Sequence, residues 1–204
     1  MKEIKGYYFI TDSNLSKNVL EDAIETIEGG AKVIQYREKK KSTGEMIKEA
    51  GKLKKLCEEN NVLFLINDRI DIALAVNADG VHLGQEDFPL EKARELLGKE
   101  KVIGVTVHDA EEAVEAEKNG ADYVSVSPIF HTDTKKDAGK AVGVEMIKAV
   151  KERVKLPITA IGGIDFSNLN KVIEAGADSV SMISAVLVQG KVKENSRKVS
   201  EAFK

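Results

Sequence analysis

Short apolar runs alternate with amphipathic stretches along the whole chain. The apolar runs have the length of strands, and the stretches between them, such as residues 110–119, carry apolar side chains at helical spacing. This alternation is typical of parallel strands joined by crossover helices. The clearest helical patterns cover residues 43–59, 110–119, 143–153 and 168–175. The predicted strands cover residues 6–12, 32–37, 63–68, 80–84, 102–108, 123–129, 158–162 and 179–184.

A faint internal repeat precedes several of these strands. Small residues at such joints let the chain turn tightly from helix to strand. Eight similar βα units in this length fit a closed barrel better than an open doubly wound sheet, which needs only four or five. We therefore predict the α/β class, with residues 1–204 forming a single (β/α)8 TIM barrel in one domain. The repeat comprises Gly30-Ala31, Ala78-Asp79, Gly120-Ala121-Asp122 and Gly176-Ala177-Asp178.

Composition narrows the possible classes of protein. Lys and Arg number 31 against 34 Asp and Glu, and this net charge of −3 argues against nucleic-acid binding, which normally needs a strongly basic face. No apolar run approaches the ~18 residues of a membrane span, and residues 1–6 are too short and polar for a signal peptide. The single cysteine, Cys57, cannot form an internal disulfide, which favours a reducing, cytoplasmic setting.

Polar residues gather where the predicted strands end. In a (β/α)8 barrel this face carries function, because the loops that follow all eight strands meet there. Any one of these residues alone is best explained as an ordinary polar loop residue. Together they place carboxylates, cations, glycines and hydroxyls at one rim, which favours an active site. In chain order they are Gln35, Arg37, Lys39, Asn67, Asp68, Asp87, Thr106, His108, Thr132, Thr134, Lys135, Gly162, Gly163, Ile183 and Ser184.

Two carboxylates on adjacent predicted strands, Asp68 and Asp87, suit a hard divalent cation such as Mg²⁺. This ion binds one or two protein carboxylates together with phosphate oxygens. The alternative is that Asp87 caps the helix that begins near Pro89.

A second anion site is predicted at the last two strands. Gly162-Gly163 and Ser184 match the barrel phosphate site, where backbone N–H groups face the anion. The alternative is that the two glycines only form a turn. A metal-assisted anion site near Arg37, Lys39 and Lys135, combined with a plain phosphate site, fits a transferase that joins two phosphorylated molecules.

Several strings along nearly the whole chain resemble the thiamine phosphate synthases, and the most specific of them is residues 80–87, which end in Gly-Gln-Glu-Asp. The resemblance implies that hydroxymethylpyrimidine diphosphate is coupled with hydroxyethylthiazole phosphate, giving thiamine phosphate and pyrophosphate. The family mechanism is dissociative, so that diphosphate leaves first and the thiazole nitrogen captures a pyrimidine-stabilised cation. The matching strings are residues 8–12, 35–39, 67–71, 80–87, 128–130 with Thr132, Thr134 and Lys135, and 160–164.

The resemblance also implies a role for each site residue. Gln35 and Asn67 would hold the pyrimidine, and Asp68 and Asp87 would bind Mg²⁺. Thr106 stands where the family usually has Ser, and residues 131–134 replace a more Pro-rich stretch. The diphosphate would be held by Arg37, Lys39 and Lys135, and the thiazole phosphate by Thr132, Thr134, Gly163, Ile183 and Ser184.

Two other functions are considered. A related thiazole tautomerase would share the fold and move a proton, for which His108 or His131 could serve. Retention of Asp68, Asp87, Lys39 and the Thr134-Lys135 pair favours the synthase instead, because an isomerase needs no diphosphate site. If the chain were a non-catalytic ligand-binding barrel, we would expect the carboxylate pair or the cations to be missing. We expect small-molecule substrates and no nucleic-acid or membrane partner, and a homo-oligomer is possible. His82 is expected to pack inside the barrel.

Overall fold

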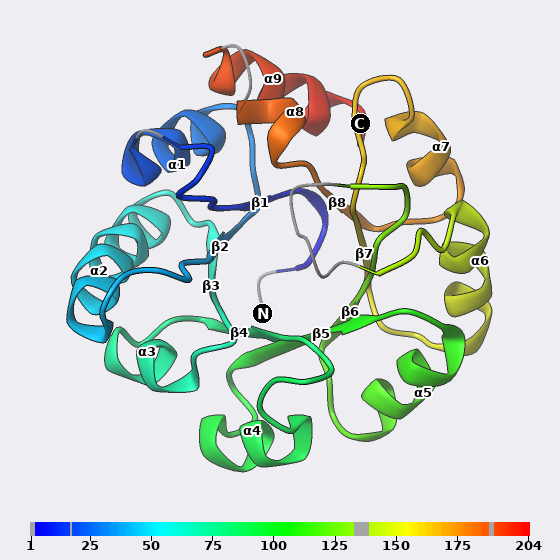
Figure 1. The fold of residues 1–204 in the computed structure, drawn as a ribbon, viewed down its shortest axis with the longest axis horizontal. Helices are drawn as coiled ribbons and strands as arrows, with labels where there is room; N and C mark the ends of the chain where they lie inside the picture. Colours follow the sequence, from blue (N-terminus) through cyan, green and yellow to red (C-terminus); the bar gives the residue numbers. More distant parts are fainter. Residues whose placement is uncertain (1–2, 17, 133–138, 188–189) are drawn as a thin grey trace.

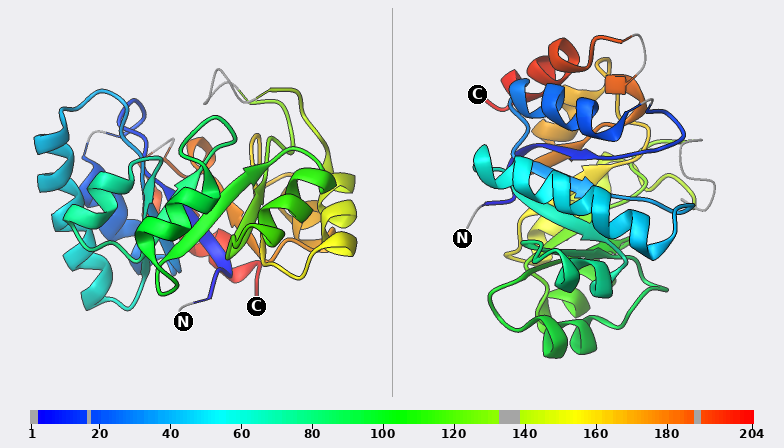
Figure 2. Two further views of the ribbon diagram at one scale, coloured as in Figure 1. Left: turned by 90° about the horizontal axis from the view of Figure 1, so that it is seen from below. Right: turned by 90° about the vertical axis from the view of Figure 1, so that its left-hand side faces the viewer.

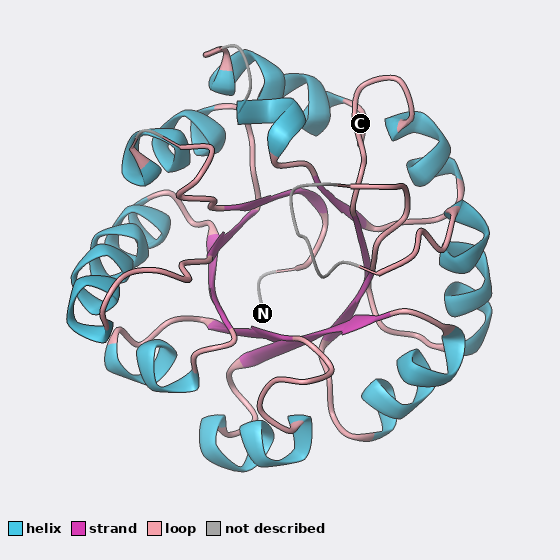
Figure 3. Cartoon of the chain, in the orientation of Figure 1, coloured by secondary structure: helices cyan, strands magenta, loops and turns pink. Residues whose placement is uncertain are grey.

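The computed structural model describes residues 3–16, 18–132, 139–187 and 190–204. Within these residues, eight parallel strands pair in sequence order and β8 pairs with β1, which closes the barrel. The helices form a ring around the strands (Figure 1, Figure 3). The predicted (β/α)8 barrel is therefore confirmed. No helix in the described part of the chain is long and apolar enough to cross a bilayer.

The elements follow one another as strand and helix from β1 to β8, and α9 follows α8 at the end of the chain. The strands are β1 (Gly6–Ile10), β2 (Val33–Tyr36), β3 (Leu63–Asn67), β4 (Gly80–Leu83), β5 (Val102–Val107), β6 (Tyr123–Val126), β7 (Ile158–Ile161) and β8 (Ser179–Ser181). The helices are α1 (Val19–Glu28), α2 (Thr43–Glu59), α3 (Ile70–Ala75), α4 (Leu90–Leu97), α5 (Ala110–Lys118), α6 (Val144–Arg153), α7 (Leu169–Glu174), α8 (Ser184–Leu187) and α9 (Val192–Glu201).

The predicted strands begin within one residue of the observed ones but extend one to three residues too far. The error is largest in β6 and β8. The regular part of β6 ends at Val126, and Pro128 has no N–H to donate, although the Ile129 N–H still donates to the Ile161 carbonyl at 2.9 Å. In β8 the strand ends at Ser181, and Ser184 is already the first residue of α8. The four predicted helices are correct to within one residue at each end.

Side chains alternate between the two faces of each strand and so form two packed layers. Those that point outward, such as Ile34, Phe64 and Val124, are fully buried against the surrounding helices. Those that point inward fill the barrel, and Leu65 and Tyr123 belong to this smaller cluster. The barrel is therefore a packed core, as is usual for this fold, and the cavity described below lies above it.

The repeated Ala-Asp pairs have a structural role that the sequence did not predict. Asp79, Asp122 and Asp178 directly precede β4, β6 and β8. Each carboxylate accepts a hydrogen bond from a backbone N–H near the start of the preceding odd-numbered strand and also pairs with a basic side chain. The N–H donors are Phe64, Ile103 and Ile158, at 2.9, 2.7 and 2.9 Å, and the basic partners are Lys54, Arg94 and Lys151, at 2.8, 2.5 and 3.4 Å.

These aspartates lie at the face where the strands begin. The chain enters β1 on this side, and Figure 2 shows that both ends of the chain emerge there together. Residues at this face of a (β/α)8 barrel usually serve stability, whereas the opposite face carries function. The carboxylates therefore tie neighbouring strands together without taking part in the site.

Candidate functional site

A cavity of about 540 Å³ lies at the C-terminal ends of the strands. Every predicted site residue that the structure describes lines it, although Thr134 and Lys135 lie outside the described residues. The structure thus brings the predicted set together, and the role assigned to each member stays a prediction. The residues of the set that line the cavity are Gln35, Arg37, Lys39, Asn67, Asp68, Asp87, Thr106, Thr132, Gly163, Ile183 and Ser184.

Asp68 is held at the end of β3 in an unusual backbone conformation. Its φ of 60° is in the left-handed region, which few non-glycine residues adopt, and its N–H donates to the carbonyl oxygen of His82 at 2.9 Å. The ammonium group of Lys39 lies 2.5 Å from its Oδ2. Burial raises the pKa of Asp68, as does the neighbouring Asp87 carboxyl, while Lys39 opposes the shift. Asp68 and Asp87 therefore lie close together, and a further cation beside them would be favourable.

Asp87 is fixed by the loop after β4. Its Oδ2 accepts a hydrogen bond from the N–H of Gly84 at 2.7 Å. Pro89, and not Asp87, precedes the first turn of α4, and no side chain caps that helix. The alternative reading of Asp87 as a helix cap is therefore wrong, and its carboxylate faces the cavity instead.

The loop after β2 presents Arg37 and Lys39. The Arg37 N–H donates to Thr11 Oγ1 at 2.9 Å, and its guanidinium lies 3.8 Å from the buried Asp12 carboxylate. Glu38 turns back into the loop and accepts from the N–H groups of Lys39 and Lys40 at 2.8 and 2.7 Å. Burial alone would raise the pKa of Glu38, but these hydrogen bonds hold it below its usual value. The loop is therefore organised before any ligand binds.

On the opposite side of the cavity, Gly162 and Gly163 follow β7 with φ of 100° and 62°. A Cβ at Gly163 would lie 2.3 Å from the carbonyl oxygen of His131, so the loop after β6 requires glycine here. This packing supports the reading of the glycines as part of a turn, while Gly163 and Ser184 also line the cavity. Both readings of the glycines are therefore compatible with the structure.

At the floor of the cavity, hydrogen bonds connect Gln35 to Thr106 through three buried side chains, two of which, Tyr8 and His82, also line the cavity. Gln35 Nε2 donates to Tyr8 Oη at 2.6 Å, and Tyr8 Oη lies 2.8 Å from Tyr123 Oη. Tyr123 Oη lies 2.8 Å from His82 Nδ1, and His82 Nε2 lies 2.9 Å from Thr106 Oγ1. We call these five residues the relay. Only 1% of Gln35 is exposed, so a small part of its side chain reaches the cavity.

Sequence reasoning missed Tyr8 and Tyr123, and it assigned His82 only to packing. The packing of His82 is confirmed, because 8% of the residue is exposed. The missed signal is strand alternation: Tyr8 and Ile10 share one face of β1 and both line the cavity, and Tyr123 lies two residues before Ser125, which also lines it.

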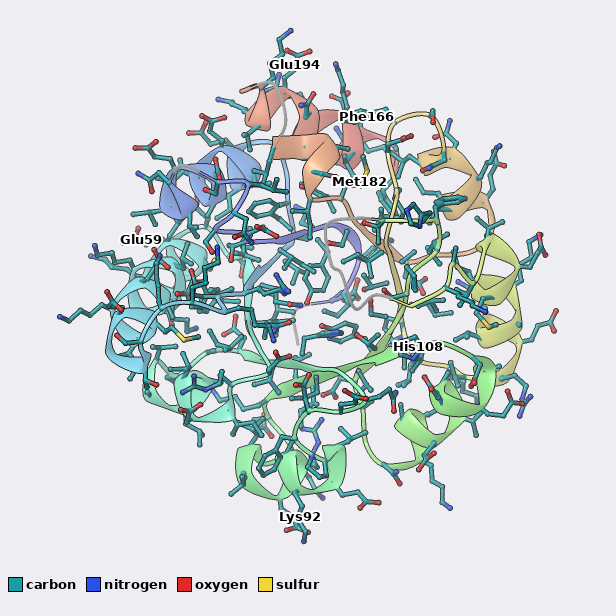
Figure 4. The ribbon with its side chains drawn as sticks, viewed as in Figure 1. Glu59, Lys92, His108, Phe166, Met182 and Glu194 are labelled. Carbon is teal, nitrogen blue, oxygen red and sulfur yellow. The ribbon has the colours of Figure 1, made fainter. Side chains whose placement is uncertain are left out.

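The two histidines considered for proton transfer differ in position. His108 lines the cavity, and its Nδ1 lies 3.0 Å from Glu112 Oε2. His131 is exposed beside Thr132. In Figure 4, His108 lies on the α5 side of the barrel and Met182, which also lines the cavity, lies on the α8 side. Lys92 and Glu194 point outward from their helices. Glu112 also lines the cavity, and sequence reasoning did not single it out.

Comparisons with known proteins agree with the resemblance seen in the sequence. A family model described as thiamine monophosphate synthase matches residues 7–186. A thiamine-phosphate synthase of Methanosarcina mazei is 55% identical over 97% of this chain and 82% of its own length. One from Clostridium acetobutylicum is 50% identical over 97% of this chain and 94% of its own.

Solved structures are also similar to this chain. A thiamine phosphate pyrophosphorylase from Pyrococcus furiosus superposes with a TM-score of 0.91 at 40% identity, covering 99% of this chain and 96% of that one. An N-acetylmannosamine-6-phosphate 2-epimerase from Clostridium perfringens superposes with a TM-score of 0.67 at 16% identity, covering 89% and 88%. The second likeness concerns the fold alone.

Proposed function

The chain belongs to the thiamine monophosphate synthase family and is a transferase; we propose that it couples hydroxymethylpyrimidine diphosphate with hydroxyethylthiazole phosphate. The products would be thiamine phosphate and pyrophosphate. One observation carries this proposal: a cation and two carboxylates, Lys39, Asp68 and Asp87, line the same cavity as Gly163 and Ser184. A single cavity could therefore hold a diphosphate and a second phosphorylated molecule side by side.

The pyrimidine diphosphate would bind on the side of β2 to β4. Arg37 and Lys39 supply cations for its diphosphate, and Lys135, outside the described residues, is predicted to join them. An Arg guanidinium can hold phosphate oxygens in pairs, while a Lys ammonium acts as a point charge. Asn67 and part of Gln35 line the cavity where the pyrimidine ring would lie.

The donor set at Asp68 and Asp87 fits Mg²⁺. The Asp87 carboxyl is close enough to disfavour the charge of Asp68, which a divalent cation would relieve. In the described residues no group of three or more His, Cys, Asp or Glu is arranged for a metal. A two-carboxylate site still suits Mg²⁺, because the ion takes its remaining ligands from water and phosphate oxygens. When bound, it would neutralise charge that grows on the departing diphosphate.

The proposed reaction exchanges one bond for another. The C–O bond to the diphosphate breaks with its electron pair on the diphosphate, and the lone pair of the thiazole nitrogen then forms the new C–N bond. Arg37 and Lys39 stabilise the leaving group as its charge grows, which is where fixed cations contribute most to catalysis. This scheme requires no nucleophile from the protein, and both histidines are left without a role in proton transfer.

The thiazole phosphate would bind at the loops after β6, β7 and β8. Thr132, Gly163 and Ser184 line this side of the cavity and offer two hydroxyls and a backbone N–H. Ile183 adds an apolar contact between the two substrates. We also propose the cytoplasm as the site of the reaction, since the one cysteine, Cys57, is a buried free thiol.

The direct test is incubation of the protein with both substrates, with and without Mg²⁺. We expect equal amounts of thiamine phosphate and pyrophosphate, and little of either without the metal. Incubation with the thiazole phosphate alone is the control. Proton exchange on the thiazole without coupling would contradict the proposal and favour the tautomerase.

A further inference from the structure

The relay is a built feature of the barrel interior. Its members come from five strands, and Tyr8 and Tyr123 are 1% and 0% exposed. Gly104 makes room for it, because a Cβ at that position would lie 1.9 Å from the Tyr123 ring. The rings of His82 and Tyr123 also pack, with centroids 5.6 Å apart. Packing thus fixes the donor and acceptor atoms in place.

The contacts of the relay allow two directions of hydrogen bonding, and the Gln35 end favours one of them. An amide nitrogen can only donate, so the Tyr8 oxygen accepts from Gln35. Either hydroxyl could donate in the contact between Tyr8 and Tyr123. The hydrogen of the buried Tyr8 hydroxyl has a partner only if it is donated to Tyr123, so we take that direction. In that direction Tyr123 donates to His82 Nδ1. The roles of the two ring nitrogens depend on the tautomer, and a neutral imidazole that accepts at Nδ1 carries its proton on Nε2, which would donate to Thr106 Oγ1.

With this direction, the two ends of the relay differ in the hydrogen bonds that they can make to a ligand. The amide carbonyl of Gln35 is not used by the relay, so it can accept a hydrogen bond. The Thr106 oxygen already accepts from His82, so its own hydrogen can be donated. Gln35 and Thr106 both line the cavity. The cavity floor therefore offers an acceptor on the β2 side and a donor on the β5 side.

We propose that the relay orients the pyrimidine ring of the first substrate by presenting this pattern to it. The inference rests on the function proposed above. An aminopyrimidine has an amino group that donates and ring nitrogens that accept, so one placement of the ring matches both ends. The reverse placement leaves buried polar groups unpaired, which is costly. Tyr8, Tyr123 and His82 are positioning residues, because their hydrogen bonds fix Gln35 and Thr106; Tyr8 and His82 also form part of the cavity floor.

The first test reads the direction of the relay in the free protein. Nitrogen-15 NMR near neutral pH distinguishes the two neutral forms of a histidine ring from the charged form, and His82→Gln identifies the signals of His82. We expect a neutral His82 with its proton on Nε2. A proton on Nδ1, or on both nitrogens, would overturn the proposal. This measurement needs no catalytic activity, so it stands apart from the coupling assay that tests the proposed function.

The second test breaks the relay at its centre. Tyr123→Phe removes a hydroxyl that serves two of its bonds. We expect the KM for the pyrimidine substrate to rise about tenfold, the loss of roughly one good hydrogen bond. The KM for the thiazole phosphate should stay within about twofold, and the His82 signals should shift.

Tyr7→Phe is the matched control. Tyr7 is equally buried, and its hydroxyl donates to the Met182 carbonyl at 3.0 Å, outside the relay. This variant should leave the pyrimidine KM and the His82 signals unchanged. An equal rise of the pyrimidine KM in both variants, or an equal rise of both KM values in Tyr123→Phe, would show a merely structural effect and overturn the proposal.

Discussion

The Nζ atom of Lys39 lies 2.5 Å from Oδ2 of Asp68, which joins the loops after β2 and β3 at the cavity. The same carboxylate lies beside Asp87, and burial together with Asp87 raises the pKa of Asp68. Lys39 thus supplies one positive charge to a place that holds two carboxylates. A divalent cation would neutralise the negative charge of the two carboxylates and leave Lys39 able to contact a diphosphate.

Asp87→Ala should reduce catalysis far more than stability. We expect kcat/KM to fall at least about a hundredfold, equivalent to ~2.7 kcal/mol of barrier, because the variant loses half of the proposed metal site. Asp71→Ala is the control, because Asp71 is an exposed carboxylate that pairs with Arg69. Normal turnover of Asp87→Ala in limiting Mg²⁺ would refute the metal assignment.

Ser184→Ala should separate the two anion sites. A hydroxyl that donates to a phosphate is worth about 1.5–3 kcal/mol, so affinity for the thiazole phosphate should fall roughly ten- to hundredfold. Titration of each substrate in turn checks this, with the pyrimidine diphosphate as the internal control. Equal weakening of both substrates would contradict the two-site arrangement.

Lys39→Ala and His108→Ala should have very different effects on coupling. His108 has no role in proton transfer here, so His108→Ala should keep coupling within about tenfold, or ~1.4 kcal/mol. Lys39→Ala should lose much more, since it removes a cation from the departing diphosphate. The sequence predicts the same loss for Lys135→Ala. If the histidine variant is inactive while Lys39→Ala is not, the tautomerase is the better assignment.

Asp122→Ala should destabilise the protein and leave the site intact. Asp122 Oδ2 accepts from the Ile103 N–H and pairs with Arg94 at the far end of the barrel. Loss of both contacts should lower the free energy of unfolding by about 1–3 kcal/mol. Urea unfolding measures this, and Asp122→Asn, which can still accept from the N–H, should lose less. A large fall in kcat at low temperature would contradict a purely structural role.

Glu38 should make stability depend on pH on the acid side. Its folded pKa lies below the ordinary value of 4.5. The stabilisation is therefore fully present above that value and is lost as the pH falls through the folded pKa. Unfolding curves of Glu38→Gln should show a weaker fall in stability with acid than the unmodified protein. An identical acid dependence would mean that Glu38 does not hold the loop in its charged form.

The sequence predicts the barrel well because each strand begins where an apolar run begins. Strand ends are harder to predict, since the apolar pattern continues past the regular strand, as in residues 127–129 after β6. The residues at the rim could be predicted because parallel strands must end on the same face. The roles of Tyr8 and Tyr123 could not, because they depend on how strands far apart in sequence face one another across the barrel.

The central claim is that the cavity stabilises a departing diphosphate and that the pyrimidine carries the positive charge before the thiazole attacks. A pyrimidine diphosphate with an electron-withdrawing substituent on its ring tests this most directly, with its binding and its rate of coupling measured separately. The account predicts nearly unchanged binding and a far slower coupling rate. A coupling rate equal to that of the unsubstituted substrate would contradict it.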